Sequence, residues 1–121
     1  MIMYTNAQSL AGKVNELSCT AVDLNPDLIL LTETWLNKDI SDAYLTIPGY
    51  ELKSDLRMDR EVGRGGGLAV YAKNGIKILK LDHTVTNHIQ ICKFLVNDVT
   101  VSLVTGPLAH PRSQLQSWRT Q

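Results

Sequence analysis

The chain has 121 residues, of which 44% are hydrophobic, a composition that fits one globular domain and excludes a largely disordered protein. Twelve basic residues balance twelve acidic ones, which argues against a module dedicated to passive nucleic-acid binding, since such modules usually carry a basic excess. The sequence shows no signal peptide and no apolar run long enough to cross a membrane. We therefore expect an intracellular protein, nuclear or cytoplasmic and not secreted.

The first third of the sequence predicts a strand, a helix and a second strand. Residues 1–5 form a short apolar segment, and the next apolar residues recur at intervals of three or four, as on one face of a helix. Ser9 is the expected N-cap, and Asn25-Pro26 ends the helix because the residue before proline avoids the α conformation. The run Leu28–Leu31 is apolar on successive residues, as in a strand buried on both faces. The predicted helical face comprises Leu10, Val14, Leu17, Ala21 and Leu24.

This β-α-β arrangement places two polar residues at one edge of the predicted sheet. The two strands should run parallel with a right-handed crossover, so Asn6 and Glu33, which follow them, should lie side by side at the carboxyl edge, where ligands tend to bind. One carboxylate beside an amide oxygen suits Mg²⁺, which is often held by one or two carboxylates with water and phosphate. The alternative is structural: Glu33 is then an exposed strand-end carboxylate and Asn6 a turn former.

The remainder of the chain predicts antiparallel strands. Residues 37–63 are polar and irregular, and a glycine-rich segment then opens onto a strand at Leu68–Ala72. Asn74-Gly75 is a strong hairpin signal, with 76–79 as the partner strand, and Asn97-Asp98 predicts a second hairpin. From Ser113 onward the sequence is polar and predicts no element.

The segment Gly63–Gly67 resembles a phosphate-binding loop only superficially. It lacks the Gly-Lys-Ser/Thr ending and leads into a strand instead of a helix, so a close approach of the backbone to a neighbouring group is the favoured role. Arg57, Arg60 and Arg64 flank or belong to this segment and are candidate contacts to a nucleic-acid backbone. A solvated charged surface is the alternative for these three residues.

Two cysteines, Cys19 and Cys92, stand alone in the sequence. Neither belongs to a CxxC motif or has a histidine at metal-binding spacing. We expect two reduced and mostly buried thiols.

Four motifs in order carry a resemblance to a known family. The segments 4–10 (YTNAQSL) and 26–36 (PDLILLTETWL), followed by 47–50 (IPGY) and 64–71 (RGGGLAVY), are similar to the opening of endonuclease domains of non-LTR retrotransposons. These domains belong to the endonuclease/exonuclease/phosphatase family. The resemblance covers residues 3 to 105 in the family's order and spacing.

The resemblance implies the N-terminal half of an α/β fold, a two-sheet β-sandwich flanked by helices with mixed parallel and antiparallel strands. It implies a phosphodiesterase that uses Mg²⁺ or Mn²⁺ and cleaves DNA. Glu33 matches the metal-holding glutamate and Asn6 the asparagine at the active-site floor. On this basis residues 1–107 form a partial domain and 108–121 an unmatched tail.

The sequence departs from the family pattern in two places. No Asp-x-Asn follows Val104, and no Ser-Asp-His is present, although the family takes its general base and phosphate-binding histidine from these motifs. Thr105 stands where the family usually has an active-site tyrosine. We therefore expect a fragment that is weak or inactive by itself. The alternative is a non-catalytic interaction or nucleic-acid-binding remnant, whose open sheet edge pairs with a partner chain or a missing C-terminal half.

Overall fold

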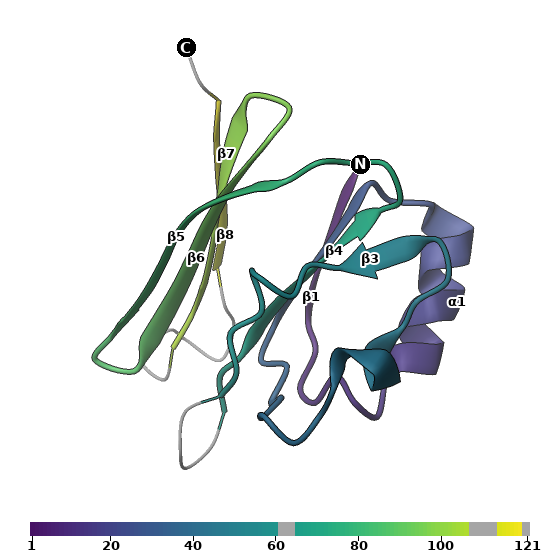
Figure 1. Cartoon of the computed structure of the whole chain (residues 1–121), viewed down its shortest axis with the longest axis horizontal. Coiled ribbons are helices and arrows are strands. Elements are labelled where there is room, and N and C mark those ends of the chain that lie inside the picture. The colour runs from purple at the N-terminus through teal and green to yellow at the C-terminus, as the bar shows by residue number, and fades with distance from the viewer. Residues whose placement is uncertain (61–64, 107–113, 120–121) are drawn as a thin grey trace.

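The computed structural model describes residues 1–60, 65–106 and 114–119, the last range as backbone only. The described chain has an α/β fold in which two four-stranded sheets form layers, and helix α1 (Val14–Leu24) covers the outer side of the first sheet (Figure 1). Sheet A has the order β1-β2-β4-β3, with β1 (Ile2–Asn6), β2 (Leu28–Thr32), β3 (Tyr50–Leu52) and β4 (Leu68–Lys73). Sheet B has the order β5-β6-β7-β8, with β5 (Leu79–Thr86), β6 (Ile89–Val96), β7 (Val99–Thr105) and β8 (Gln114–Arg119).

The predicted β-α-β unit is confirmed. Strands β1 and β2 pair in parallel, with Ile2 opposite Leu28 and Asn6 opposite Thr32. All five residues of β2 are buried, as the continuous apolar run indicated, because α1 covers one face of sheet A and sheet B covers the other. The fold class predicted from the sequence is therefore correct.

Helix α1 begins later than its apolar periodicity indicated. Ser9 donates its backbone N–H to the Glu33 carbonyl at 3.1 Å, and Leu10 donates to the Thr34 carbonyl at 2.9 Å. These bonds hold the chain beside the end of β2, so the helix starts at Val14, and Ser9 is not its N-cap. The helix ends as predicted, with Asn25 in the left-handed conformation donating its N–H to the Ala21 carbonyl.

Two apolar cores lie on opposite faces of sheet A. The first packs α1 against sheet A, and only part of the predicted helical face enters it, because Leu24 at the end of the helix is 48% exposed. The second fills the space between the sheets, where apolar side chains of β2 and β4 meet those of β6 and β7. Its members from sheet B are Cys92, Phe94, Val96, Val101 and Leu103.

The hairpin predicted at Asn74-Gly75 is wrong. The turn forms, with the Ile76 N–H donating to the Lys73 carbonyl at 3.0 Å, but the chain then crosses to sheet B and continues as β5. Strand β4 has no free side for a hairpin partner, because it already pairs antiparallel with β2 and with the short strand β3. The sequence offered no prediction of β3.

Sheet B is an antiparallel meander. The hairpin at Asn97-Asp98 is confirmed, and both turn residues have positive φ (49° and 63°), as a two-residue turn with matching twist requires. A second such turn at Asn87-His88 joins β5 to β6. Strand β8 pairs with β7 in the polar C-terminal segment for which the sequence predicted no element.

The remaining expectations concern the cysteines and the membrane. Cys92 is buried as expected, and its burial raises the thiol pKa to about 12, whereas Cys19 is exposed, contrary to the prediction. In the described part of the chain, no helix has the length and apolar character needed to cross a membrane.

Candidate metal centre at the edge between the sheets

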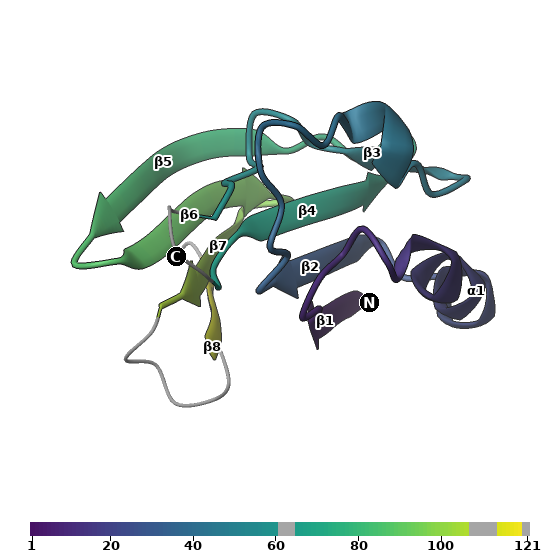
Figure 2. The same cartoon turned by 90° about the horizontal axis from the view of Figure 1, so that it is seen from below.

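The carboxyl ends of β1 and β2 lie side by side, as the sequence predicted. Asn6 is the last residue of β1 and pairs with Thr32, directly before Glu33. The Ala7 N–H donates to the Thr32 carbonyl at 2.8 Å, which continues the pairing past the strand end. At Glu33 the backbone turns into the left-handed region (φ 52°). In Figure 2, β1 is the outer strand of sheet A on the side where α1 lies.

The side-chain carbonyl oxygen of Asn6 is buried without a partner. Successive side chains of a strand point to opposite faces, so Asn6 lies on the same face of β1 as Tyr4. Tyr4 packs against the core between the sheets. The Oδ1 atom of Asn6 has no hydrogen-bond partner among the described residues. Buried polar oxygens are nearly always satisfied by protein or water, so this oxygen at the strand end is available to accept from a water or a ligand.

The Glu33 carboxylate is held by neutral hydrogen-bond donors from three segments. The Gly66 N–H donates to Oε1 at 3.2 Å and to Oε2 at 3.1 Å. The Trp35 indole N–H donates to Oε1 at 3.3 Å, and the Thr105 hydroxyl donates to Oε2 at 2.5 Å. Thr105 ends β7 in sheet B, so this carboxylate bridges the two sheets. Glu33 takes part in none of the ion pairs between described residues.

The glycines before β4 allow the backbone to approach this carboxylate closely. Gly65, Gly66 and Gly67 all have positive φ, and a Cβ at Gly67 would lie 2.2 Å from the Thr34 hydroxyl oxygen. The predicted role in close backbone approach is thus confirmed for these three residues. The N–H groups of Gly66 and Gly67 are already committed to Glu33 and Gln90, so they do not form a phosphate cradle.

Sequence reasoning missed Gln90, which lies beside Thr105 in the β6–β7 pairing. Gln90 is 3% exposed. Its Oε1 accepts the Gly67 N–H at 2.6 Å, and its Nε2 donates to the Asp59 carbonyl at 2.6 Å. A buried glutamine within an apolar strand pattern is the only sequence signal for this contact, because its partners lie far away in the sequence.

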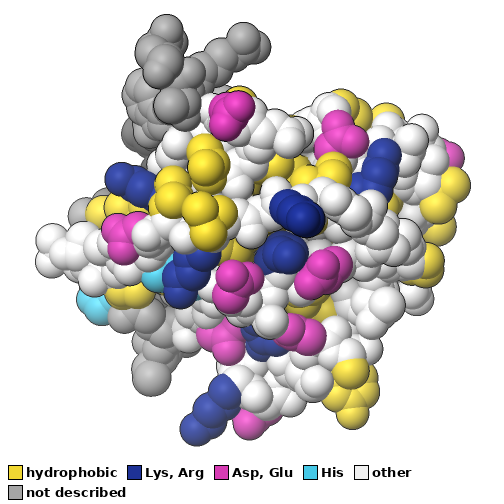
Figure 3. Space-filling model, turned by 45° about the horizontal axis from the view of Figure 1, so that its top comes forward, with side chains coloured by type: hydrophobic (Ala, Val, Ile, Leu, Met, Phe, Trp, Pro, Cys, Tyr) yellow, Lys and Arg dark blue, Asp and Glu magenta, His cyan; other side chains and the backbone are white. Residues whose placement is uncertain are grey.

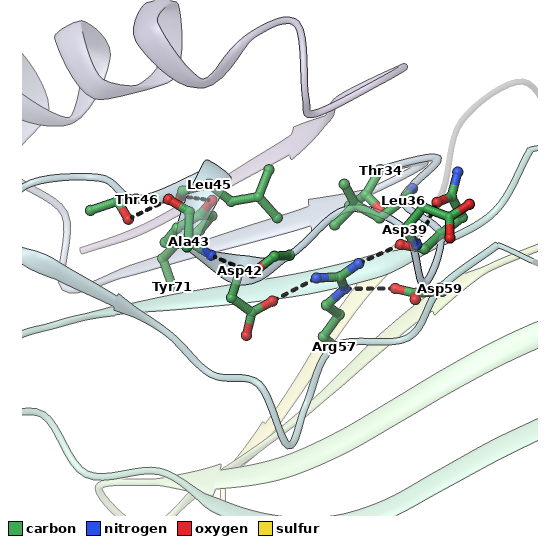
Figure 4. A network of polar contacts seen from close by, with 12 residues as sticks. Thr34, Leu36, Asp39, Asp42, Ala43, Leu45, Thr46, Arg57, Asp59 and Tyr71 are labelled. Carbon is green, nitrogen blue, oxygen red and sulfur yellow. Dashed lines mark hydrogen bonds and ion pairs between the residues drawn. The ribbon is translucent and has the colours of Figure 1, made fainter.

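Arg57, one of the three predicted nucleic-acid contacts, lies within a network of polar contacts (Figure 4). Its guanidinium pairs with Asp42 and Asp59, both at 2.6 Å, and donates to the Asn37 carbonyl at 2.8 Å. Burial lowers the pKa of this group, but hydrogen bonds to Asp59 and Asp42 outweigh burial and raise the pKa overall. Arg60 donates its backbone N–H to the Leu36 carbonyl. Arg64 lies outside the described residues, and nucleic-acid contact by the three arginines stays a prediction.

The surface charge is mixed. On the face shown in Figure 3, basic and acidic side chains are interspersed instead of forming one basic stripe, in keeping with the equal numbers of the two in the sequence. Long-range attraction of a polyanion to this face is therefore weak, and binding of a phosphate at the Glu33 edge would depend on local charge.

The residues at this edge fit a hard divalent cation. Asn6 and Glu33 offer oxygen atoms as metal ligands, and the hydrogen bonds that Glu33 Oε1 accepts from described residues are 3.2 Å or longer, which makes them weak. No cluster of three or more histidine, cysteine or acidic side chains with a metal-binding arrangement occurs among the described residues. One carboxylate and one amide oxygen match Mg²⁺, which keeps several waters, better than zinc or calcium, which take more protein ligands.

Comparisons with known proteins add little to this geometry. No protein-family model matches the chain, and no curated protein matches it. Among solved structures, it is similar to the human Nocturnin catalytic domain with a bound sulfate anion, at 13% sequence identity and a TM-score of 0.43. The match covers 96% of this chain but 47% of the other, so the chain spans about half the length of that domain. A likeness this distant identifies neither the family nor the activity.

Proposed function

We propose that this chain is part of a metal-dependent phosphodiesterase domain of the endonuclease/exonuclease/phosphatase type, related to the endonucleases of non-LTR retrotransposons. Glu33 and Asn6 hold a divalent cation, Mg²⁺ or Mn²⁺, and DNA is the substrate. The observation that carries this proposal is the buried, unpaired Oδ1 of Asn6, on the strand that pairs with the one leading to Glu33. The four sequence motifs in family order support the assignment.

The chain's own residues account for only one part of the reaction. When bound, a divalent cation supplies neutralisation of the charge that builds on the phosphate oxygens during attack by water. Glu33 and Asn6 would bind and orient the cation. Thr105 and Gly66 hold the Glu33 carboxylate in place. A proton must also leave the attacking water, and the phosphate must be bound. The sequence contains neither the Asp-x-Asn motif after Val104 nor the Ser-Asp-His motif, from which the family it resembles takes its general base and phosphate-binding histidine. We therefore propose cation binding with weak or no cleavage.

A second candidate function is a non-catalytic interaction module. Strand β1 is the outer strand of sheet A, and one of its sides has no strand partner among the described residues. Ile2 on this strand is 42% exposed. An open strand edge of this kind can pair with a strand from another chain. This function requires no cation at Glu33.

Two measurements on the same variants distinguish these functions. The wild type and a Glu33→Gln variant are titrated with Mg²⁺ while tryptophan emission is recorded, because the Trp35 indole contacts the Glu33 carboxylate. Both are then incubated with supercoiled plasmid and Mg²⁺. The proposal expects an emission change only in the wild type and little nicking by either protein. Identical titrations would contradict the proposal, and Glu33-dependent nicking at an ordinary enzymatic rate would contradict the expected inactivity.

A further inference from the structure

The two oxygens of the Glu33 carboxylate are bound unequally. Oε2 accepts the Thr105 hydroxyl at 2.5 Å, a length typical of a strong hydrogen bond from a hydroxyl to a carboxylate. Within the described parts of the chain, Oε1 accepts only the Gly66 N–H at 3.2 Å and the Trp35 indole N–H at 3.3 Å, both long for N–H donors. One oxygen is thus firmly held, and the other can exchange its partners at little cost.

Thr105 is itself fixed in place by its surroundings. It is 1% exposed, at the end of β7, and pairs with Gln90 of β6. Gln90 in turn binds the Gly67 N–H and the Asp59 carbonyl, each at 2.6 Å. Two neighbouring residues of sheet B therefore hold both the carboxylate and the glycine segment that donates to it.

We propose that Thr105 and Gln90 are positioning residues for cation binding at Glu33. Thr105 occupies Oε2 and leaves Oε1 as the single carboxylate ligand of the cation, while Gln90 holds the glycine segment that fixes the tilt of the carboxylate. This inference rests on the proposed function. It assigns to threonine a role that depends on its hydroxyl, at the position where family members usually carry a tyrosine.

Trp35 provides a spectroscopic reporter of this arrangement. Its indole N–H donates to Oε1, and an N–H group and a cation cannot share the same side of one oxygen because both present positive charge to it. Binding of a cation to Oε1 therefore displaces the indole from this contact while keeping it close to the ion. The side chain is 36% exposed and so has room to move.

The experiment uses Tb³⁺, an oxygen-seeking ion whose luminescence is sensitised by a nearby indole. All proteins carry Trp118→Phe, which leaves Trp35 as the only tryptophan of the two in the sequence. Thr105→Val removes the hydroxyl at nearly constant volume, and Thr105→Ser restores it. Thr100→Val is the matched control, since it makes the same change near the start of β7. Glu33→Gln tests the site itself, and Mg²⁺ competition reports affinity for the smaller ion.

We expect Thr105→Val to weaken Tb³⁺ binding by about 10-fold or more, the usual cost of removing a partner of a metal ligand. Thr105→Ser and Thr100→Val should bind as the parent protein does. Gln90→Met should also weaken binding, by a smaller factor. The Gly66 N–H can still donate to Glu33, but without the bond between Gln90 and Gly67 the glycine segment is no longer held in a fixed position. Urea unfolding curves show whether each variant is folded under the conditions of the binding experiment.

The outcomes separate this inference from the proposed function. If Glu33→Gln abolishes binding but Thr105→Val binds as the parent does, the positioning role is wrong and the site stands. If Glu33→Gln binds as the parent does, both are wrong. If Thr105→Val does not fold, Thr105→Ala is compared with Thr105→Ser, and equal affinity of these two overturns the positioning role.

Discussion

Two polar clusters of similar size differ in how their charges are balanced. In the Arg57 network, which comprises Asn37, Asp42, Arg57 and Asp59, one cation meets two carboxylates and a backbone carbonyl. In the Glu33 cluster, which comprises Glu33, Trp35, Gly66 and Thr105, one carboxylate meets neutral donors and, among the described residues, no cationic side chain. Neutral donors orient a carboxylate without placing a positive charge beside it, so the Glu33 carboxylate retains attraction for a cation. In the Arg57 network a guanidinium already lies against both carboxylates.

This contrast assigns different roles to similar hydrogen bonds. In the Arg57 network the bonds join the loop before β3 to the segment after it, and their loss should appear as lost stability. In the Glu33 cluster the bonds set the geometry of a ligand, and their loss should appear mainly as lost affinity. Variants that alter one property and leave the other unchanged test this division.

The largest expected effect is at Gly67, which follows Gly66 of the Glu33 cluster and packs closely against Thr34. Gly67→Ala places a methyl group 2.2 Å from the Thr34 hydroxyl oxygen, at φ +100°, and Thr34 is 1% exposed and cannot move freely. We expect a loss of about 3 kcal/mol in the free energy of unfolding, together with lost cation binding. Chemical denaturation provides the measurement.

Gly75→Ala is the control for backbone strain. Gly75 has a similar φ of +96°, but nothing lies within 4 Å of an added Cβ, so only the conformational cost of about 1 kcal/mol remains. If both variants lose the same stability, close packing of the glycine segment against Thr34 contributes nothing.

The next effect is expected at Arg57. Arg57→Met keeps much of the side-chain volume but leaves Asp42 and Asp59 without their partner. The Arg57 side chain is 11% exposed and the two carboxylates about a third, so screening by solvent reduces the loss to about 2 kcal/mol. Denaturation should show this loss, and the Mg²⁺ titration at Glu33 should be unchanged. If the Arg57→Met variant is as fully folded as the parent protein but binds the cation more weakly, the two clusters are coupled.

The smallest effect is a decrease in stability in acid, due to His83 in β5. Burial is the main cause that lowers the pKa of His83, and the charge of Lys80 lowers it further. A hydrogen bond with the Leu56 backbone and the negative charges of Asp55 and Asp82 act in the opposite direction. Its Nε2 is buried and unpartnered among the described residues. The pKa of His83 is lower in the folded state than in the unfolded state, where it is about 6.5. When the pH falls below about 6.5, the unfolded state therefore binds more protons than the folded state.

Stability attributable to His83 is thus complete above pH 6.5 and falls as the pH decreases toward the folded pKa. The denaturation midpoint should decrease as the pH falls below the unfolded pKa of about 6.5, and His83→Phe should flatten this profile. The difference between the wild-type and His83→Phe profiles is the quantity to compare. Parallel profiles would show that His83 is not responsible.

The sequence predicted those features that follow from local pattern. The parallel pairing that brings Asn6 beside Thr32, the fully buried β2 and the turn at Asn97-Asp98 all arise from periodicity or turn chemistry within a few residues. The hairpin at Asn74-Gly75 failed because a local turn signal does not reveal that both sides of β4 are occupied.

The contacts of the site itself could not be predicted because they join distant segments. The Thr105 hydroxyl meets Glu33 across 72 residues and Gln90 meets Gly67 across 23, and no local pattern encodes either contact. Arg57 illustrates the same limit in part, since its sequence neighbourhood indicated a surface charge, whereas one of its two carboxylate partners, Asp42, lies 15 residues away.

The most direct test of the central claim, that Glu33 and Asn6 form a divalent-cation site, is paramagnetic broadening by Mn²⁺ in the amide spectrum of the labelled protein. At low Mn²⁺, the signals of Gly66, Gly67 and the Asn6 side-chain amide should broaden first, and Glu33→Gln should abolish this selectivity. Uniform broadening, or broadening centred on another carboxylate such as Asp27, would contradict a cation site at this edge.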